Sequence, residues 1–253
     1  MTEPDHHSLT AGSATIAFRR TEGSSPGVIF CGGFQSDMTG TKAAALEAWA
    51  KAAGRAFVRF DYQGHGASSG RFIDGTIGRW AEDARLVFDQ CTKGPQIIVG
   101  SSMGAWIMLL VALSRSERVA GLVGIASAPD FTEDLIWGTL STEQRLQLLD
   151  DEVLRLPSEY GEPTPITLTL IDEARRHLLL RGLIRLACPV RLLHGMQDAD
   201  VPWVTSVRLA ERLAGADVRL SLIKDGDHRL SRDQDIALMC RTVEELAATT
   251  APR

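Results

Sequence analysis

The sequence predicts an α/β domain in which a mostly parallel sheet is covered by helices on both faces. Short runs rich in β-branched and aromatic residues alternate with longer helical patterns along most of the chain. Two of the short runs, QIIVGS (96–101) and VAGLVGIAS (119–127), are apolar on both faces. Such strands are typical of a parallel sheet buried between helices. A length of 253 residues with 44% hydrophobic residues favours one domain of this kind over two.

The first half of the chain is expected to begin with two strands, ATIAFRR (14–20) and GVIFCGG (27–33). The stretch TEGSSP between them is typical of a tight loop. An alanine-rich helix at 41–54 is ended by a glycine, and a strand follows at 56–64. The remaining elements expected in this half are a helix near 76–91, a strand at 96–101, a helix from 103 and a strand at 119–127.

The alternation stops after Ala128. From about 129 to 187 the patterns are helical, notably STEQRLQLLDDEVLRL (141–156) and LTLIDEARRHLLLRG (168–182), with no evident strand. An insertion of this length exceeds ordinary loops, so we expect a helical cap at 129–187 within a single domain spanning 1–253. The alternation then resumes with a strand at 188–195, a helix near 204–214, a strand at 218–226 and a last helix near 231–247.

Charge and composition exclude several classes of protein. The formal net charge of −5 offers no basic surface for a phosphate backbone, so no nucleic-acid partner is expected. The first residues, MTEPDHHSLT, lack the apolar core of a signal peptide, and no long apolar run predicts a membrane span. These features favour a cytoplasmic protein. The four cysteines are far apart without metal-ligand spacing, so reduced thiols are expected.

The stretch GSSMG (100–104) lies where an apolar strand ends and a helix begins. This is the context of a nucleophile elbow, a strained turn that presents a serine hydroxyl. Gly100 and Gly104 each lie two residues from Ser102, where small residues allow the strand and helix to approach closely, whereas Ser101 has bulky residues at those distances. Ser102 is therefore the expected nucleophile. The alternative is a turn in which the serines only cap the helix.

A serine nucleophile needs a histidine base, and the histidine needs an orienting carboxylate. Behind an elbow of this kind the order along the chain is serine, acid, histidine. Two later strand ends supply candidates, namely Asp198 or Asp200 after RLLHG and His228 after VRLSLIKDG. The alternative for His228 is a surface histidine in a polar loop. His194, at the end of its own strand, is interpreted as a packing residue.

An oxyanion hole requires backbone N–H groups close to the nucleophile. The run Gly32-Gly33-Phe34 ends an early strand, so the N–H groups of Phe34 and Met103 are the expected donors. The glycines could instead form only a tight turn. The sequence contains no complete P-loop, no HExxH and no carboxylate cluster. We therefore expect no cofactor and no metal.

Together these residues resemble the α/β-hydrolase superfamily. The segments that are similar to a mitochondrial group of acyl-protein thioesterases and acyl-glucuronide esterases in it are GFQSDMTGTKA (33–43), RFDYQGHGASSG (59–70), GPQIIVGSSMGAW (94–106), RLLHGMQDADVPW (191–203) and DGDHR (225–229). The resemblance covers most of the chain and implies the α/β-hydrolase fold. It also implies the triad Ser102, Asp198 and His228, in which Asp198 is preferred to Asp200, and an oxyanion hole at Phe34 and Met103.

The resemblance implies a serine esterase or thioesterase that works through an acyl-enzyme. Its partner would be a small-molecule ester or thioester, or an acylated protein. The middle of the cap, 129–165, matches the group poorly, and its organellar leader is not found, which implies a bacterial-type cytosolic homologue. The same triad could serve a peptidase, an acyltransferase or a carbon–carbon bond hydrolase. A non-catalytic binding protein is the alternative from another class, and the oligomeric state is not predicted.

Two features of the cap leave their roles open. Its apolar residues Leu135, Ile136, Trp137 and Leu140 either line an acyl pocket or form the packed face of a helix. Arg175 and Arg176 either belong to a solvated face or meet a leaving group that carries a carboxylate.

Overall fold

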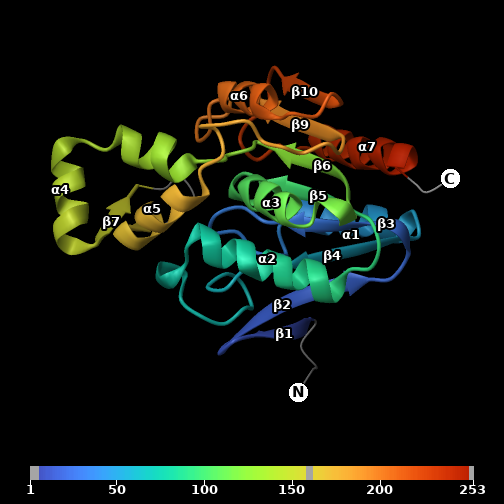
Figure 1. Cartoon of the computed structure of the whole chain (residues 1–253), viewed down its shortest axis with the longest axis horizontal. Helices are drawn as coiled ribbons and strands as arrows, with labels where there is room; N and C mark the ends of the chain where they lie inside the picture. The colour runs from blue at the N-terminus through green and yellow to red at the C-terminus, as the bar shows by residue number, and fades with distance from the viewer. Residues whose placement is uncertain (1–5, 158–161, 251–253) are drawn as a thin grey trace.

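The computed structural model describes residues 6–157 and 162–250. In this part of the chain, eight strands form one sheet with the order β1-β2-β4-β3-β5-β6-β9-β10 (Figure 1). These strands are β1 (His7–Ala11), β2 (Ala14–Thr21), β3 (Ser24–Cys31), β4 (Arg55–Phe60), β5 (Gln96–Ser101), β6 (Val119–Ile125), β9 (Val190–Gly195) and β10 (Val218–Ile223). From β4 to β10 all neighbours pair in parallel. The expected α/β class is confirmed.

Helices cover both faces of the sheet. The flanking helices are α1 (Thr41–Ala52), α2 (Ile77–Cys91), α3 (Met103–Ser114), α6 (Val204–Arg212) and α7 (Asp233–Thr250), and short helical turns lie at η1 (Phe72–Asp74) and η2 (Ser116–Arg118). Helices α2, α3 and α6 share one core, which includes Ile98 of β5. Helices α1 and α7 share the other, which includes the neighbouring Ile97. Because successive strand residues point to opposite faces, β5 is buried along its whole length and apolar at Ile97, Ile98 and Val99.

The strand order differs from the order along the chain. The strands β2 and β3 are joined by a short turn, yet β4 lies between them and pairs with β2 antiparallel and with β3 parallel. The edge strand β1, which the sequence analysis did not predict, pairs antiparallel with β2 along its whole length. Its residues HSLTA are mostly exposed, so they lack the apolar alternation by which a strand is recognised.

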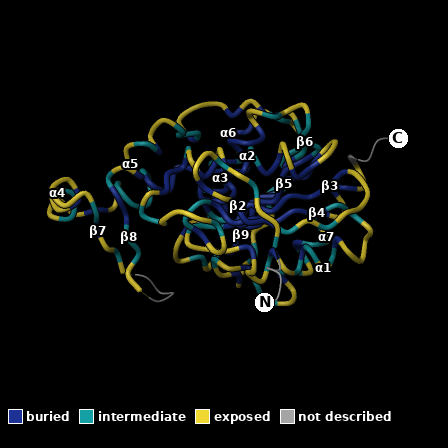
Figure 2. The backbone as a smooth tube through the Cα atoms, turned by 90° about the horizontal axis from the view of Figure 1, so that it is seen from below, coloured by how far each residue is buried: buried dark blue, intermediate teal, exposed yellow. Residues whose placement is uncertain are grey.

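The residues between β6 and β9 form a cap that projects from one side of the sheet (Figure 1). Its elements are η3 (Thr132–Ile136), η4 (Trp137–Thr139), α4 (Thr142–Asp151), β7 (Val153–Leu156), β8 (Thr164–Thr167), α5 (Leu168–Ala174) and η5 (Arg175–His177). They share a small apolar core that contains Leu148, Leu154 and Ile166. Figure 2 shows α4 mostly exposed at the far end of the cap, whereas the central strands are buried.

The expectation of a cap without strands is wrong, because β7 and β8 pair as an antiparallel hairpin. The helix expected over 141–156 ends at Asp151, and the next residue, Glu152, has the left-handed φ of 59° that stops a helix. Beyond this point Leu154 pairs with Ile166, and both side chains are buried in the cap core. Residues 158–161 of the connection between the two strands lie outside the described residues.

The helix expected over 168–182 is also shorter, because α5 ends at Ala174 and continues only as the single turn η5. Further along, the backbone N–H groups of Leu179 and Leu180 donate to the carboxylate of Asp130 at 2.8 and 2.9 Å. These amides are therefore satisfied by a side chain instead of by helix carbonyls. Asp130 is fully buried, and these two backbone hydrogen bonds, with a third from the Arg181 guanidinium, fasten the end of the cap to its beginning.

Two further expectations concerned reduced cysteines and the lack of a membrane-spanning helix. All four cysteines are free, and burial raises the pKa of Cys31 to about 12 and that of Cys91 to about 11. These two thiols are therefore not nucleophiles at neutral pH. Within residues 6–157 and 162–250, no helix combines the length and apolar character needed to cross a bilayer.

Candidate active site

Ser102 stands at the turn between β5 and α3, with a backbone φ of 54° and ψ of −121°. A non-glycine residue in this region is strained, and such strain is characteristic of a nucleophile elbow. The turn is possible because the strand and helix lie very close together. A Cβ added to Gly100 would come within 2.5 Å of the Gly104 carbonyl oxygen, and one added to Gly104 would overlap the Cys31 carbonyl. Ser101, the last residue of β5, is buried.

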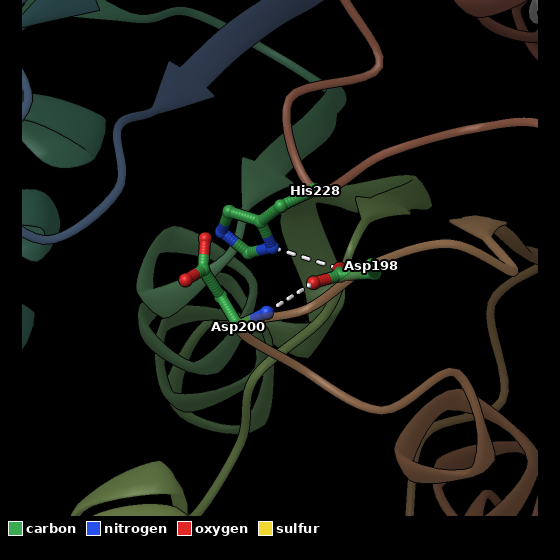
Figure 3. A group of neighbouring side chains, drawn as sticks. All are labelled: Asp198, Asp200 and His228. Carbon is green, nitrogen blue, oxygen red and sulfur yellow. Dashed lines mark hydrogen bonds and ion pairs between the residues drawn. The ribbon is translucent and has the colours of Figure 1, made fainter. Parts of the chain in front are cut away.

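His228 and Asp198 meet at the neighbouring strand ends. The Nδ1 atom of His228 lies 2.8 Å from Oδ2 of Asp198, and Figure 3 shows this contact with the Asp200 backbone nitrogen converging on the same carboxylate. The Asp198 side chain is fully buried, whereas that of His228 is 18% exposed. Because Nδ1 is engaged by the carboxylate, Nε2 is the ring nitrogen left for a reacting group.

Four N–H groups hold the carboxylate of Asp198. Its Oδ1 accepts from the backbone amides of Asp200 at 2.9 Å and Val201 at 2.7 Å. Its Oδ2 is shared by His228 and by Nε2 of His194, which lies 3.1 Å away. Burial alone would raise the pKa of Asp198, but the hydrogen bonds from His194, His228 and Val201 outweigh it and hold the pKa well below its usual range. Asp198 is therefore an anion at every pH at which the protein would work.

His194 is the residue whose place the sequence analysis missed. It is fully buried, as a packing residue would be, but its ring contacts Asp198, Val201 and Ser206 through hydrogen bonds. The available signal was the spacing HGMQD, which puts a histidine four residues before the acid. That spacing alone does not show whether the ring turns toward the acid or away from it.

Asp200 lies in the same loop but does not take the position of Asp198. Its backbone amide holds Asp198, and Figure 3 shows its carboxylate beside the ring of His228. Ligand-type atoms of Asp198, Asp200 and His228 lie within 4.8 Å of one another. Both Asp198 oxygens already accept N–H donors of the protein, however. This arrangement suits a carboxylate that orients a histidine better than one that faces a cation.

The expected oxyanion donors flank the elbow. Phe34 follows Gly33, whose Cα carries no side chain that would separate β3 from Ser102. Met103 is the first residue of α3. Among the described residues, neither backbone N–H has a hydrogen-bond acceptor in the protein. The Phe34 ring is held by edge-on contacts with Phe72, Trp80 and Phe131, whose centroids lie 4.9 to 5.7 Å away.

Ser102 and His228 line one cavity of about 420 Å³. Its remaining wall carries both polar and apolar side chains and comes mainly from the loop after β3, the first turn of α1 and the loop that carries His228. Lys42 lies in this wall, and its Nζ donates to the Arg229 carbonyl. Burial lowers the pKa of Lys42 to about 8, an effect that nearby Asp227 partly offsets. Protonated and neutral amine are therefore both present near neutral pH.

The cap residues on which two interpretations were open have defined surroundings. The side chain of Leu140 is buried in the cap core, and Leu135 and Ile136 pack against the core of the main domain. The Arg175 guanidinium is bound to Glu133 and Asp172 at 2.8 and 2.7 Å. None of these residues lines the cavity of Ser102 and His228.

Comparisons with known proteins show the family of the chain. Residues 25–157 match the family described as "Serine aminopeptidase, S33". The chain is 41% identical over 233 residues to the human palmitoyl-protein thioesterase ABHD10, mitochondrial, which covers 91% of this chain and 76% of that protein. The bovine protein of the same name is 42% identical over the same length.

Solved structures give the same result. The mouse protein ABHD10 superimposes with a TM-score of 0.91 at 39% identity, covering 97% of this chain and 99% of that one. A protein from Agrobacterium vitis superimposes with a TM-score of 0.92 at 41% identity, covering 96% and 98%. Identity of this extent, together with the family match over more than half of the residues, establishes the relationship. The chain therefore belongs to the α/β-hydrolase family that includes the ABHD10 proteins, and it is a hydrolase.

Proposed function

We propose that this protein hydrolyses thioesters and carboxylic esters through an acyl-enzyme formed on Ser102. The observation that carries the proposal is the strained Ser102 elbow opening on the same cavity as His228, whose far nitrogen is held by a buried carboxylate. A serine needs a base within reach, and the base needs an orienting anion. Ser102, His228 and Asp198 supply these three roles.

In the first half of the reaction, Ser102 Oγ attacks the acyl carbon while its proton passes to Nε2 of His228. The N–H groups of Phe34 and Met103 stabilise the tetrahedral oxyanion, and Asp198 stabilises the imidazolium. When the intermediate collapses, the bond from carbon to sulfur or oxygen breaks. The imidazolium gives its proton to the departing thiolate or alkoxide, which leaves Ser102 acylated.

In the second half, His228 removes a proton from water, and the resulting hydroxide attacks the acyl carbon. The same two N–H groups hold the second oxyanion. Its collapse breaks the bond to Ser102 Oγ, which regains a proton from the imidazolium. The products are a carboxylic acid and the free enzyme, so the cycle needs only water and no cofactor or metal.

Support for a thioester substrate comes from the relatives, which are named palmitoyl-protein thioesterases. An acylated protein or a small thioester or ester is accordingly the proposed partner. A cytoplasmic location is also part of the proposal and rests on the sequence alone, since the names of the relatives include "mitochondrial". Fractionation of cells that express the tagged chain would test the location.

The experiment is a turnover assay with an acyl thioester, short and long p-nitrophenyl esters and an acyl glucuronide. Ser102→Ala is compared with the matched variant Ser101→Ala and with wild type. The proposal predicts that Ser102→Ala loses turnover and labelling by a fluorophosphonate probe, whereas Ser101→Ala keeps both. If wild type neither turns over any substrate nor reacts with the probe, the triad is idle and the protein is a binding protein of hydrolase fold.

A further inference from the structure

His194 forms a buried hydrogen-bonded chain behind the acid of the proposed triad. Its Nε2 atom lies 3.1 Å from Asp198 Oδ2 and 2.9 Å from the Val201 carbonyl oxygen. Its Nδ1 atom lies 2.7 Å from Ser206 Oγ at the start of α6. His194 and Ser206 have no solvent exposure. Because neither residue can exchange these partners for water, the protein itself must satisfy each donor and acceptor.

The partners of His194 assign its protons. Both groups that face Nε2 are acceptors, so Nε2 carries a hydrogen. Among the described residues, Nδ1 of His194 is the one hydrogen-bond partner of the Ser206 hydroxyl, from side chains or backbone. The hydroxyl therefore donates to Nδ1, which is left without a hydrogen. His194 is thus a neutral imidazole whose single N–H points at Asp198 and Val201.

We propose that His194 is a positioning residue for the hydrolytic reaction: locked by Ser206, it shares Oδ2 of Asp198 with His228 and so limits how strongly the acid draws a proton onto His228. This inference rests on the proposed function of Ser102, His228 and Asp198. His194 contacts neither Ser102 nor the cavity that Ser102 and His228 line, so it acts only through Asp198.

The sign of the effect follows from the shared oxygen. A donor on Oδ2 disperses the negative charge that stabilises protonated His228. Without the His194 donor the carboxylate attracts the imidazolium more strongly, so the acid limb of the pH–rate profile moves to higher pH. The other charged groups near His228 are the carboxylate of Asp200 beside its ring, Asp227 and Arg229 on either side in the chain, and Lys42 on the Arg229 carbonyl. All of them remain in place when His194 is replaced.

The test compares His194→Leu, which has no donor, with His194→Gln, whose amide can donate to Asp198. His65→Leu is the matched control, since His65 is a buried histidine whose ring contacts Tyr62, Phe72 and Trp80 and not the triad. For each folded variant, the pH profile of kcat/KM is measured with an acyl thioester. The His228 titration is followed separately by NMR of the imidazole.

We expect His194→Leu to move the acid limb of the profile upward by about 0.5 to 1 pH unit, with the NMR titration moving equally. Below that limb its kcat/KM is about threefold to tenfold lower than that of wild type. His194→Gln returns the limb toward its wild-type position, and His65→Leu leaves it unchanged. A purely structural role would lower kcat/KM equally at every pH and leave the limb in place, which would overturn the proposal.

Ser206→Ala provides a second variant if His194→Leu does not fold. Without the hydroxyl, Nδ1 loses the partner that anchors the ring to α6, so the Nε2–H bond to Asp198 is held less firmly and the limb moves in the same direction by a smaller amount. An unmoved limb in folded Ser206→Ala overturns the proposal. The NMR titration separates the two levels of inference. An inactive wild type refutes the proposed function. An NMR titration of His228 that is the same in wild type and His194→Leu refutes only the positioning role.

Discussion

Replacing Asp198 by asparagine tests the proposed acid with almost no change of shape. The carboxylate accepts four N–H groups at 2.7 to 3.1 Å, from His228, His194 and the amides of Asp200 and Val201. Asparagine offers one acceptor oxygen and one NH₂ donor. The two backbone amides cannot become acceptors, so the oxygen stays with them and the NH₂ group faces the two imidazoles.

This rearrangement changes the tautomer of His228. Facing a donor, Nδ1 must accept, and the ring hydrogen moves to Nε2, the atom that must take the Ser102 proton. In serine hydrolases with this triad, the corresponding loss is about 10,000-fold in kcat, and we expect the same order here. The buried Nε2–H of His194 also loses its anionic acceptor and keeps only the Val201 carbonyl, which costs about 1 kcal/mol of unfolding free energy.

The stability difference between wild type and Asp198→Asn also depends on pH. The folded-state pKa of Asp198 is held below the ordinary value of 3.8. Its contribution to stability is therefore fully present above about pH 4 to 5 and is lost as the pH falls through the folded-state value. The free energy gap measured by urea unfolding should therefore narrow as the pH falls below about 4.

The assay is thioester turnover at pH 7.5, with Asp200→Asn as the matched control. Asp200 acts on Asp198 through its backbone amide, which the substitution keeps. We therefore expect a loss of less than about tenfold for this control. If Asp200→Asn abolished turnover while Asp198→Asn stayed within tenfold of wild type, the assignment of the acid would be refuted.

Three other changes have defined outcomes. Between pH 8 and 10.5 the Lys42 amine is neutral in the folded protein and still protonated in the unfolded chain, so its contribution to the unfolding free energy rises by about 2 kcal/mol. Lys42→Met should remove this rise. An equal rise in wild type and Lys42→Met, measured by urea unfolding, would contradict the prediction. Gly104→Ala should overlap the Cys31 carbonyl and abolish fluorophosphonate labelling, lowering the melting temperature in a thermal scan. Asp130→Asn should leave one of the Leu179 and Leu180 amides without its acceptor, costing about 1 to 3 kcal/mol, and speed hydrogen exchange there.

The elements that carry the candidate site could be predicted from sequence because each site residue follows a strand with a recognisable pattern, apolar in β5 and alternating in β10. Ser102 follows β5, Asp198 follows β9 and His228 follows β10. In a parallel sheet the carboxyl ends of such strands share one edge, so short local patterns are enough to bring these residues together. The distinction between Asp198 and Asp200 also has a local signal. A carboxylate that accepts the N–H groups two and three residues later, as Asp198 does, is a common feature of turns.

What sequence patterns missed depends on contacts that are distant along the chain. The end of the cap leaves its helical pattern because Asp130 binds amides about 50 residues away. The role proposed for His194 depends on Ser206, which lies 12 residues later in α6, beyond the loop that carries Asp198. The spacing of apolar residues along a sequence does not predict such long-range hydrogen bonds. Where these bonds form, they override the local preference for a helix.

The cap contacts the candidate active site at Phe34. Some substitutions in the cap are therefore expected to affect the proposed chemistry. The residues of the proposed triad all follow strands of the main domain, and the cap contributes none of them. The Phe34 ring, however, packs edge-on against Phe131 at the start of the cap, 5.5 Å between centroids, and its backbone N–H is a proposed oxyanion donor. None of the described cap residues lines the cavity of Ser102 and His228, so substitutions farther out in the cap should leave the proposed chemistry unchanged. A substitution of Phe131 by a small residue should instead lower turnover. The Phe34 ring would lose one of its packing contacts, and the backbone N–H of Phe34, the proposed oxyanion donor, would be held less firmly.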